Sequence, residues 1–218
     1  MIRKKKSNYA MSSRSRAAII GACVLAAVVL ILLDHGAIRP GWVQQVKSGA
    51  GSDARDFTRY HGGVFNVVKI VDGDTIDIDA RDGRHGHTRI RLWGIDTPET
   101  KSDRYGVMYF GPEAAEFTKE LAFGKPVTIY LDEENRTRGR YGRLLAYVQL
   151  PDKRFLNELL VSEGYAYADT RFRHSLYHKY QQLEAAARGA RKGLWQGITR
   201  DQLPQWLQRH KPKLLVDK

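Results

Sequence analysis

Cysteine is almost missing from this 218-residue chain, in which Cys23 is the only one. It lies in an apolar run near the N-terminus, so the rest of the chain has no cysteine that could form an internal disulfide. The fold must therefore be held by core packing, for which 42% hydrophobic residues suffice in one ordinary domain. Internal repeats and low-complexity blocks are also missing, and the composition argues against wholesale disorder.

Acidic residues are scarce in the first fifty positions, where Asp34 stands against eight lysines and arginines. This segment contributes +7 of the net charge of +12, and the remaining residues contribute only +5. A strongly basic chain indicates a polyanionic partner. Here more than half of the excess positive charge lies outside the expected folded domain, where it could equally well determine the orientation of a membrane segment. Charge alone therefore does not establish nucleic-acid binding.

Residues 17–33, AAIIGACVLAAVVLILL, contain no charged side chain. A helix of this length rises about 1.5 Å per residue and just crosses the hydrocarbon core of a bilayer. Basic residues precede the run, so the positive-inside rule places residues 1–16 in the cytoplasm and residues 34–218 on the other side. We predict a single-pass anchor. The alternative is secretion after signal-peptide cleavage, although Asp34 and His35 stand where a cleavage site needs small residues.

A folded domain is predicted to begin at Gly62, after a weakly periodic tether over residues 34–61. Alternating β-branched residues predict strands, Asp72-Gly73-Asp74 predicts a hairpin turn, and a wider apolar spacing predicts helices. The expected strands are 64–71, 75–80, 87–95, 126–132 and 143–150. The expected helices are 111–124, 155–164 and 174–193, followed by an amphipathic segment over 199–210.

The order of these elements, three strands, a helix, two strands and further helices, predicts a mixed α+β fold. A five-stranded OB-fold β-barrel with packed helices fits the order, preceded by the single transmembrane helix. This domain would extend over residues 62–196, and residues 197–218 would form a C-terminal extension. We expect this domain to be monomeric.

Asp74 opens the second expected strand immediately after the hairpin turn. One interpretation is purely structural, because Asp-Gly is a sequence that tight turns prefer. Turn chemistry does not require a second aspartate followed by Thr75, however. A carboxylate held rigidly at the start of a strand also suits a metal ligand. Both interpretations of Asp74 stand on the local sequence.

The stretch RLWGIDTPE at 91–99 also has two interpretations. Asp96 or Thr97 would cap a helix whose dipole Glu99 complements, or these residues would form half of a metal site. Strand alternation places Arg91 on the polar face of its strand. It would serve there as a surface cation or as a ligand for phosphate.

A second basic group lies in RTRGRYGRLLAY at 136–147, a charge run that is typical of a solvated loop. Arg143 differs from the other arginines of this run, because it opens the fifth expected strand directly after Tyr141 and Gly142. A guanidinium fixed at a strand end offers a fork that matches phosphate oxygens.

Together, these segments resemble the staphylococcal nuclease (thermonuclease-like) family. The motifs that carry the resemblance follow the family's order: DGDT at 72–75, RLWGIDTPE at 91–99, GPEAAEFTKEL at 111–121, RYGRLLAY at 140–147, LNELLVSEGYAY at 156–167 and GLW at 193–195. The resemblance spans about residues 62–196. It implies an OB-fold core and a Ca²⁺-dependent phosphodiesterase that acts on DNA and RNA.

The resemblance also implies a role for each matching residue. These are Asp74, Asp96 and the Thr97 carbonyl for the metal, Arg91, Glu99 and Arg143 for catalysis, and Tyr141, Arg140, Tyr165 and Tyr167 for substrate binding. Glu99 would be the general base toward a metal-associated water, and the two arginines would hold the scissile phosphate. So few carboxylates predict a weak calcium site, with a dissociation constant of roughly 10⁻⁴ to 10⁻³ M.

The main alternative is a catalytically inactive OB-fold module that binds nucleic acid or a protein. The enzyme is favoured by the joint presence of five charged side chains, because a module without catalysis has little reason to keep them together. These are Asp74, Arg91, Asp96, Glu99 and Arg143. The seven histidines show no metal-ligand spacing, except that His174 and His178 stand four apart on an expected helix. We expect surface or packing roles for them.

Overall fold

The computed structural model describes residues 52–101 and 106–215. The anchor expected over residues 17–33 lies outside these residues. Among the helices of the described part, none is long and apolar enough to span a membrane.

Five strands form a closed barrel in the order β1-β2-β3-β6-β5. Their bounds are Val64–Asp72 for β1, Thr75–Ile78 for β2, Thr88–Leu92 for β3, Pro126–Tyr130 for β5 and Leu144–Gln149 for β6. All neighbouring pairs are antiparallel except β3 and β6, which run parallel. A separate short pair, β4 (Ile95–Asp96) and β7 (Tyr167–Ala168), lies beside the barrel. The prediction of a mixed fold with a closed five-stranded barrel is confirmed.

Alternation along β3 separates the core from the functional face. Ile90 and Leu92 are buried in the barrel core, at 0% and 1% exposure. Arg89 is exposed and Arg91 only partly buried on the opposite face. A strand turns successive side chains to opposite sides, so the apolar core of the barrel itself directs Arg91 outward.

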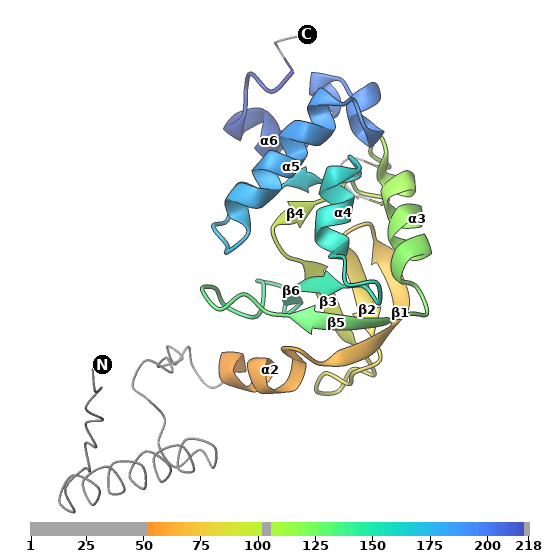
Figure 1. Ribbon diagram of the computed structural model, residues 1–218, viewed down its shortest axis with the longest axis vertical. Helices are drawn as coiled ribbons and strands as arrows, with labels where there is room; N and C mark the ends of the chain where they lie inside the picture. Colours follow the sequence, from red (N-terminus) through yellow and green to blue (C-terminus); the bar gives the residue numbers. More distant parts are fainter. Residues whose placement is uncertain (1–51, 102–105, 216–218) are drawn as a thin grey trace, which may run out of the picture. The chain divides into compact units, whose positions relative to one another are not determined.

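Helices cover one end and one side of the barrel (Figure 1). Their bounds are Gly111–Ala122 for α3, Leu156–Ser162 for α4, Tyr177–Gly189 for α5 and Gln205–His210 for α6, with 3₁₀ turns η1 at Gly193–Gln196 and η2 at Arg200–Gln202. The helix α4 lies between α5 and the barrel. Gly124, at the end of the expected helix 111–124, adopts a left-handed conformation with φ of 71°, which is typical of a residue that ends a helix.

A further helix, α2 (Ser52–Tyr60), occupies the described end of the segment that the sequence predicted to be a tether. It packs under the barrel, where Tyr60 is fully buried and bonds the Thr88 hydroxyl at 2.9 Å. The expected tether over 34–61 is therefore wrong for its last residues. Its polar sequence, SDARDFTRY, gave no sign of this docking.

The C-terminal segment forms a second, smaller hydrophobic core instead of a loose extension. Leu203 and Leu207 pack there with Trp195, Tyr167 and Ala187, and all five are at most 3% exposed. Because β7 supplies Tyr167 and pairs with β4, this second core lies directly behind Asp96.

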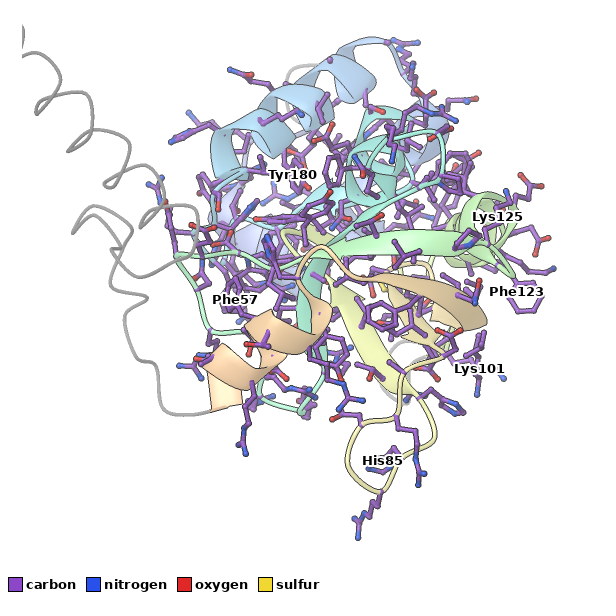
Figure 2. The ribbon with its side chains drawn as sticks, turned by 60° about the horizontal axis from the view of Figure 1, so that its bottom comes forward. Phe57, His85, Lys101, Phe123, Lys125 and Tyr180 are labelled. Carbon is purple, nitrogen blue, oxygen red and sulfur yellow. The ribbon has the colours of Figure 1, made fainter. Side chains whose placement is uncertain are left out.

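The described histidines have the surface and packing positions that the sequence predicted. Figure 2 shows His85 at the tip of the long loop between β2 and β3, where it points away from the barrel. His174 is instead buried, and its Nδ1 lies 3.0 Å from the Tyr147 hydroxyl.

Candidate active site

An open cleft of about 1200 Å³ gathers most residues that the sequence predicted to act. It lies between the ends of β2 and β3, the segment 93–101 and the loop that joins β5 to β6. The predicted residues on its lining are Asp74, Arg91, Asp96, Glu99, Arg140, Tyr141 and Arg143. Seven Lys or Arg and five Asp or Glu side chains line it in all, so basic groups outnumber the acidic set.

Gly73 lets the two acidic segments approach each other. A Cβ atom at this position would lie 2.9 Å from Thr97 Oγ1, so any larger residue would push the turn away from Thr97. The close approach allows the Thr97 backbone N–H to donate to Asp74 Oδ2 at 2.9 Å. The buried Thr118 hydroxyl holds the same turn by donating to the Gly73 carbonyl at 2.6 Å. Backbone packing therefore brings Asp74 beside the segment that carries Asp96.

Arg91 joins the two aspartates. Its Nη1 lies 2.8 Å from Asp74 Oδ2, and its Nη2 lies 2.5 Å from Asp96 Oδ1. Nη1 also donates to the Ile95 carbonyl at 2.8 Å. Only 13% of the Arg91 side chain is exposed, so its interpretation as a surface cation is wrong.

The electrostatics of this group are those of a crowded acidic site. Burial raises the pKa of Asp96, and the charge of Asp74 adds to the rise while Arg91 opposes it. Burial alone lowers the pKa of Arg91, but Asp74 and Asp96 more than offset this, and the pKa of this guanidinium stays above its ordinary value. Further positive charge beside the two aspartates would therefore be stabilising.

Glu99 lines the same cleft. Its backbone is held by α3: a Cβ atom at Gly111 would lie 2.5 Å from the Glu99 carbonyl oxygen, and the Met108 N–H donates to that oxygen at 3.0 Å. Loss of hydration raises the pKa of Glu99 to about 7, and a hydrogen bond with Asp72 and nearby carboxylates add to this rise. Residues 97–99 begin no helix, so the helix-cap interpretation of this stretch is wrong.

The loop between β5 and β6 carries the second basic group. Tyr141 is 70% exposed, and the guanidinium groups of Arg140 and Arg143 lie 4.7 and 5.6 Å from its ring centroid. Burial, together with the nearby charge of Arg91, lowers the pKa of Arg143. Asp74 and Glu99 oppose this shift only in part, so an anionic ligand in the cleft would further stabilise the charged Arg143.

Arg138 fixes this loop to the rest of the domain. Its Nε donates to Asp56 of α2 at 2.8 Å, and its Nη1 lies 2.5 Å from Asp82. The same Nη1 donates to the Gly142 carbonyl at 3.0 Å. The helix that replaces the expected tether therefore helps to position Tyr141 and Arg143.

Tyr165 and Tyr167, which the resemblance assigned to substrate binding, do not line the cleft. Tyr167 is fully buried against Trp195, and Tyr165 stacks on Phe117 with ring centroids 4.0 Å apart. Aromatic surface in the cleft comes instead from Trp93 and the half-exposed Phe172, whose centroids are 5.7 Å apart. Trp93 directly follows β3, and alternation along the expected strand 87–95 already put it on the same side as Arg91, whereas no pattern marks Phe172.

Two other residues that the sequence did not indicate contact Asp96. Arg171 Nη2 lies 3.2 Å from Asp96 Oδ1, and Trp206 Nε1 donates to Asp96 Oδ2 at 2.7 Å. Neither residue stands in a motif that resembles a metal or phosphate site.

The residues present fit a hard divalent cation. Such ions prefer carboxylate and carbonyl oxygens, and Asp74 and Asp96 already direct oxygens toward one cationic group. Within the described ranges, no group of three or more His, Cys, Asp or Glu side chains is arranged to hold a metal. The donors would then be two carboxylates, the Thr97 carbonyl and water, a sparse set that is typical of weak calcium sites.

Comparison with known proteins identifies the family. The sequence model for the staphylococcal nuclease homologue matches residues 89–197. A thermonuclease of Staphylococcus hyicus is 32% identical over 176 residues, which cover 80% of this chain and 95% of that protein. A thermonuclease of Staphylococcus intermedius is 36% identical over 148 residues, or 68% of this chain and 79% of the relative.

A third relative, an uncharacterized endonuclease of Escherichia coli O157:H7, is 34% identical over 151 residues, or 66% of this chain and 84% of its own length. These alignments are long enough to include both the barrel and the cleft, and they disfavour the interpretation as an inactive binding module. The chain therefore belongs to the staphylococcal nuclease family and is a nuclease, a hydrolase that acts on ester bonds.

Proposed function

We propose that this nuclease depends on Ca²⁺, hydrolyses phosphodiester bonds of DNA or RNA by attack of water, and is tethered to a membrane through residues 17–33. The observation that carries the proposal is the convergence of Asp74 and Asp96 on a single cationic group. Glu99 and Arg143 line the same cleft, which supports their proposed roles as a base and a second guanidinium acting on one substrate.

The metal would be held by the carboxylates of Asp74 and Asp96 and by the main-chain carbonyl of Thr97. When bound, Ca²⁺ would supply positive charge to the phosphate oxygens and lower the pKa of a coordinated water. The raised pKa of Asp96 supports this assignment, because a buried carboxylate of this kind gains most from a nearby cation.

Glu99 would take the proton from the attacking water. A general base works best when its pKa is close to the operating pH, and the pKa of Glu99 is raised to about 7. The water oxygen would form the new bond to phosphorus while the bond to the leaving ester oxygen breaks. The leaving oxygen would take a proton from solvent and Glu99 would return its proton to solvent, so that one water is consumed.

Arg91 and Arg143 would donate hydrogen bonds to the phosphate. A phosphodiester carries one negative charge, and its five-coordinate transition state carries more, so fixed donors bind the transition state more strongly than the substrate. Arg91 is held in place by its contacts with two carboxylates and the Ile95 carbonyl, and Arg143 by its position at the start of β6.

The shape and lining of the cleft favour a flexible polynucleotide. Tyr141 and the Phe172–Trp93 pair line it and offer aromatic faces on which unpaired bases would stack. The surrounding arginines match the phosphate backbone and carry no base preference. Both DNA and RNA would therefore be substrates.

The direct test is digestion of single-stranded DNA and RNA by the full chain in a non-ionic detergent, with Ca²⁺ and then with excess chelator. We expect cleavage with Ca²⁺ only. The variant Glu99→Gln should keep the fold and reduce the rate by roughly 100-fold or more, because it removes the base. Glu120→Gln, an exposed glutamate on α3, is the matched control and should cleave like the wild type.

Equal cleavage in Ca²⁺ and chelator would refute metal dependence, and an unchanged rate in Glu99→Gln would remove the general base. The tether is tested by fractionating cells that produce the full chain. Activity in the membrane fraction supports an anchor with the domain on the extracytoplasmic side, whereas activity in the medium indicates cleavage of a signal peptide.

A further inference from the structure

Trp206 contacts the proposed metal site from a part of the chain that the family model does not match. It lies in α6, beyond the matched residues 89–197. Its indole Nε1 donates to Asp96 Oδ2 at 2.7 Å, across a separation of 110 positions. An indole N–H is a donor only, so it bonds the carboxylate in its ionised form without competing for a proton.

The Trp206 ring is itself held in place. The Arg171 guanidinium lies 4.4 Å from the ring centroid, within the range of a cation–π contact. Arg171 in turn donates to the buried carboxylate of Asp169 through Nε at 2.8 Å and Nη2 at 2.7 Å. The same Nη2 lies 3.2 Å from Asp96 Oδ1. Trp206 and Arg171 thus form a bracket around one carboxylate.

This bracket determines how the Asp96 carboxylate is turned. Trp206 donates a hydrogen bond to Oδ2. Oδ1 lies 2.5 Å from Arg91 Nη2 and 3.2 Å from Arg171 Nη2. A carboxylate with both oxygens bonded cannot rotate freely about its last bond. Folding has then already ordered the Asp96 carboxylate, so cation binding does not have to restrict its rotation. A cation binds more tightly to a ligand that is already oriented.

Buried contacts hold α6 in position. Leu203 and Leu207 pack in the second hydrophobic core, at 3% and 0% exposure. Lys211 Nζ, directly after α6, lies 2.5 Å from Glu184 Oε2, and the Glu184 side chain is only 3% exposed. The position of Trp206 therefore follows from the packing of the whole C-terminal segment.

We propose that the C-terminal segment 199–215 completes the metal site, with Trp206 as a positioning residue that orients the Asp96 carboxylate and Arg171 as the residue that holds Trp206. This inference rests on the proposed metal-dependent function. Trp206 does not touch the substrate or the reacting atoms. It acts through Asp96 alone.

The test is a Ca²⁺ titration of the full chain in detergent, without nucleic acid, for the wild type and Trp206→Phe. Phenylalanine keeps an aromatic face for Arg171 but lacks the N–H donor. We expect the dissociation constant for Ca²⁺ to rise about tenfold or more, the size of effect that loss of a partner behind a metal ligand produces. Calorimetry measures this constant, and the Ca²⁺ concentration for half-maximal thermal stabilisation measures it independently.

Trp195→Phe is the matched control. Trp195 belongs to the same second core and is 1% exposed, and its Nε1 has no hydrogen-bond partner among the described residues. The substitution removes the same atoms from the same cluster and should leave the dissociation constant within about twofold. Tryptophan fluorescence gives a further signature: Ca²⁺ should change the emission of the wild type and of Trp195→Phe, and this change should be largely lost in Trp206→Phe.

Equal Ca²⁺ dissociation constants for Trp206→Phe and Trp195→Phe would overturn the inference and leave the proposed function intact. A melting temperature lowered in Trp206→Phe, with an unchanged dissociation constant, would show a merely structural role and overturn it as well. Failure of the wild type to bind Ca²⁺ would overturn the proposed function, and the inference with it. A tenfold loss confined to Trp206→Phe supports both.

Discussion

Arg91 shows how one side chain organises the site. It contacts Asp74, Asp96 and the Ile95 carbonyl with a single guanidinium whose nitrogens point in fixed directions. An ammonium group is a point charge on a flexible stem and cannot reach these partners together. The geometry of Arg91, and not only its charge, therefore holds the segments that carry Asp74 and Asp96 side by side.

Arg91→Lys should consequently reduce kcat by roughly 100-fold, although the formal charge of the site is unchanged. Steady-state kinetics on single-stranded DNA at saturating Ca²⁺ measures the effect. Arg89→Lys is the matched control on the same strand face, because Arg89 pairs with Asp77 alone at 2.8 Å and is half exposed. Similar rates in the two variants would mean that charge suffices, and the role given to the guanidinium fork would be wrong.

At this scale the sequence identified the groups that converge and missed those that hold them. Asp74 and Asp96 follow short, recognisable turns, and alternation along β3 indicated the direction of Arg91. Trp206 reaches Asp96 from a distant segment through tertiary packing, which no local pattern encodes. The resemblance assigned Tyr165 and Tyr167 to substrate binding. In the structure their rings pack against Phe117 and Trp195, respectively.

At the scale of elements, a few buried polar residues tie helices to the barrel. Asp132, two residues after β5, accepts a hydrogen bond from the Tyr147 hydroxyl at 2.6 Å. It also accepts from the Ser175 backbone N–H at 2.9 Å, just before α5. Burial alone raises the pKa of Asp132, but the hydrogen bonds from Tyr147 and Ser175 lower it to about 2. One carboxylate thus links β5, β6 and the start of α5.

Acid should weaken this link. The pKa of Asp132 is lower in the folded chain than the ordinary 3.8, so its contribution to the free energy of unfolding is present above pH 4 and is lost as the pH falls toward 2. The contribution is roughly 2 kcal/mol. Asp132→Asn should be less stable at pH 7 and should lack this part of the decline between pH 4 and 2.

Urea unfolding of the full chain at several pH values between 2 and 7 measures this difference. The neighbouring, exposed Glu133 provides the control, because Glu133→Gln should follow the wild-type curve. If Asp132→Asn and the wild type lost stability in parallel over the whole range, the link would not depend on the charge of Asp132.

Elements with strong periodicity were predictable, and those that depend on distant partners were not. The five strands and α3 to α5 follow alternation or helical spacing in their own sequences. The helix α2 docks through Asp56, which pairs with Arg138 in the loop between β5 and β6. Such a pairing appears only once the chain is folded, so residues 52–60 resembled a polar tether.

At the scale of the whole molecule, the site lies at the junction of two hydrophobic cores. Asp74 follows the hairpin turn of the barrel, whereas Asp96 pairs in β4 with Tyr167 of the second core. The two proposed metal ligands therefore belong to different packing units of the domain. A cation bound to both would cross-link these units and stabilise the folded state by an amount that grows with the logarithm of its concentration once this exceeds the dissociation constant.

The central claim is that Asp74 and Asp96 hold one cation together, and a calorimetric cycle tests it most directly. Ca²⁺ is titrated into the full-length wild type, Asp74→Asn, Asp96→Asn and the double variant. We predict one ion per chain for the wild type, a loss of binding with either substitution, and little further loss in the double variant, because both carboxylates serve the same ion. Binding that survives either substitution, or losses that simply add as at two independent sites, would contradict the account.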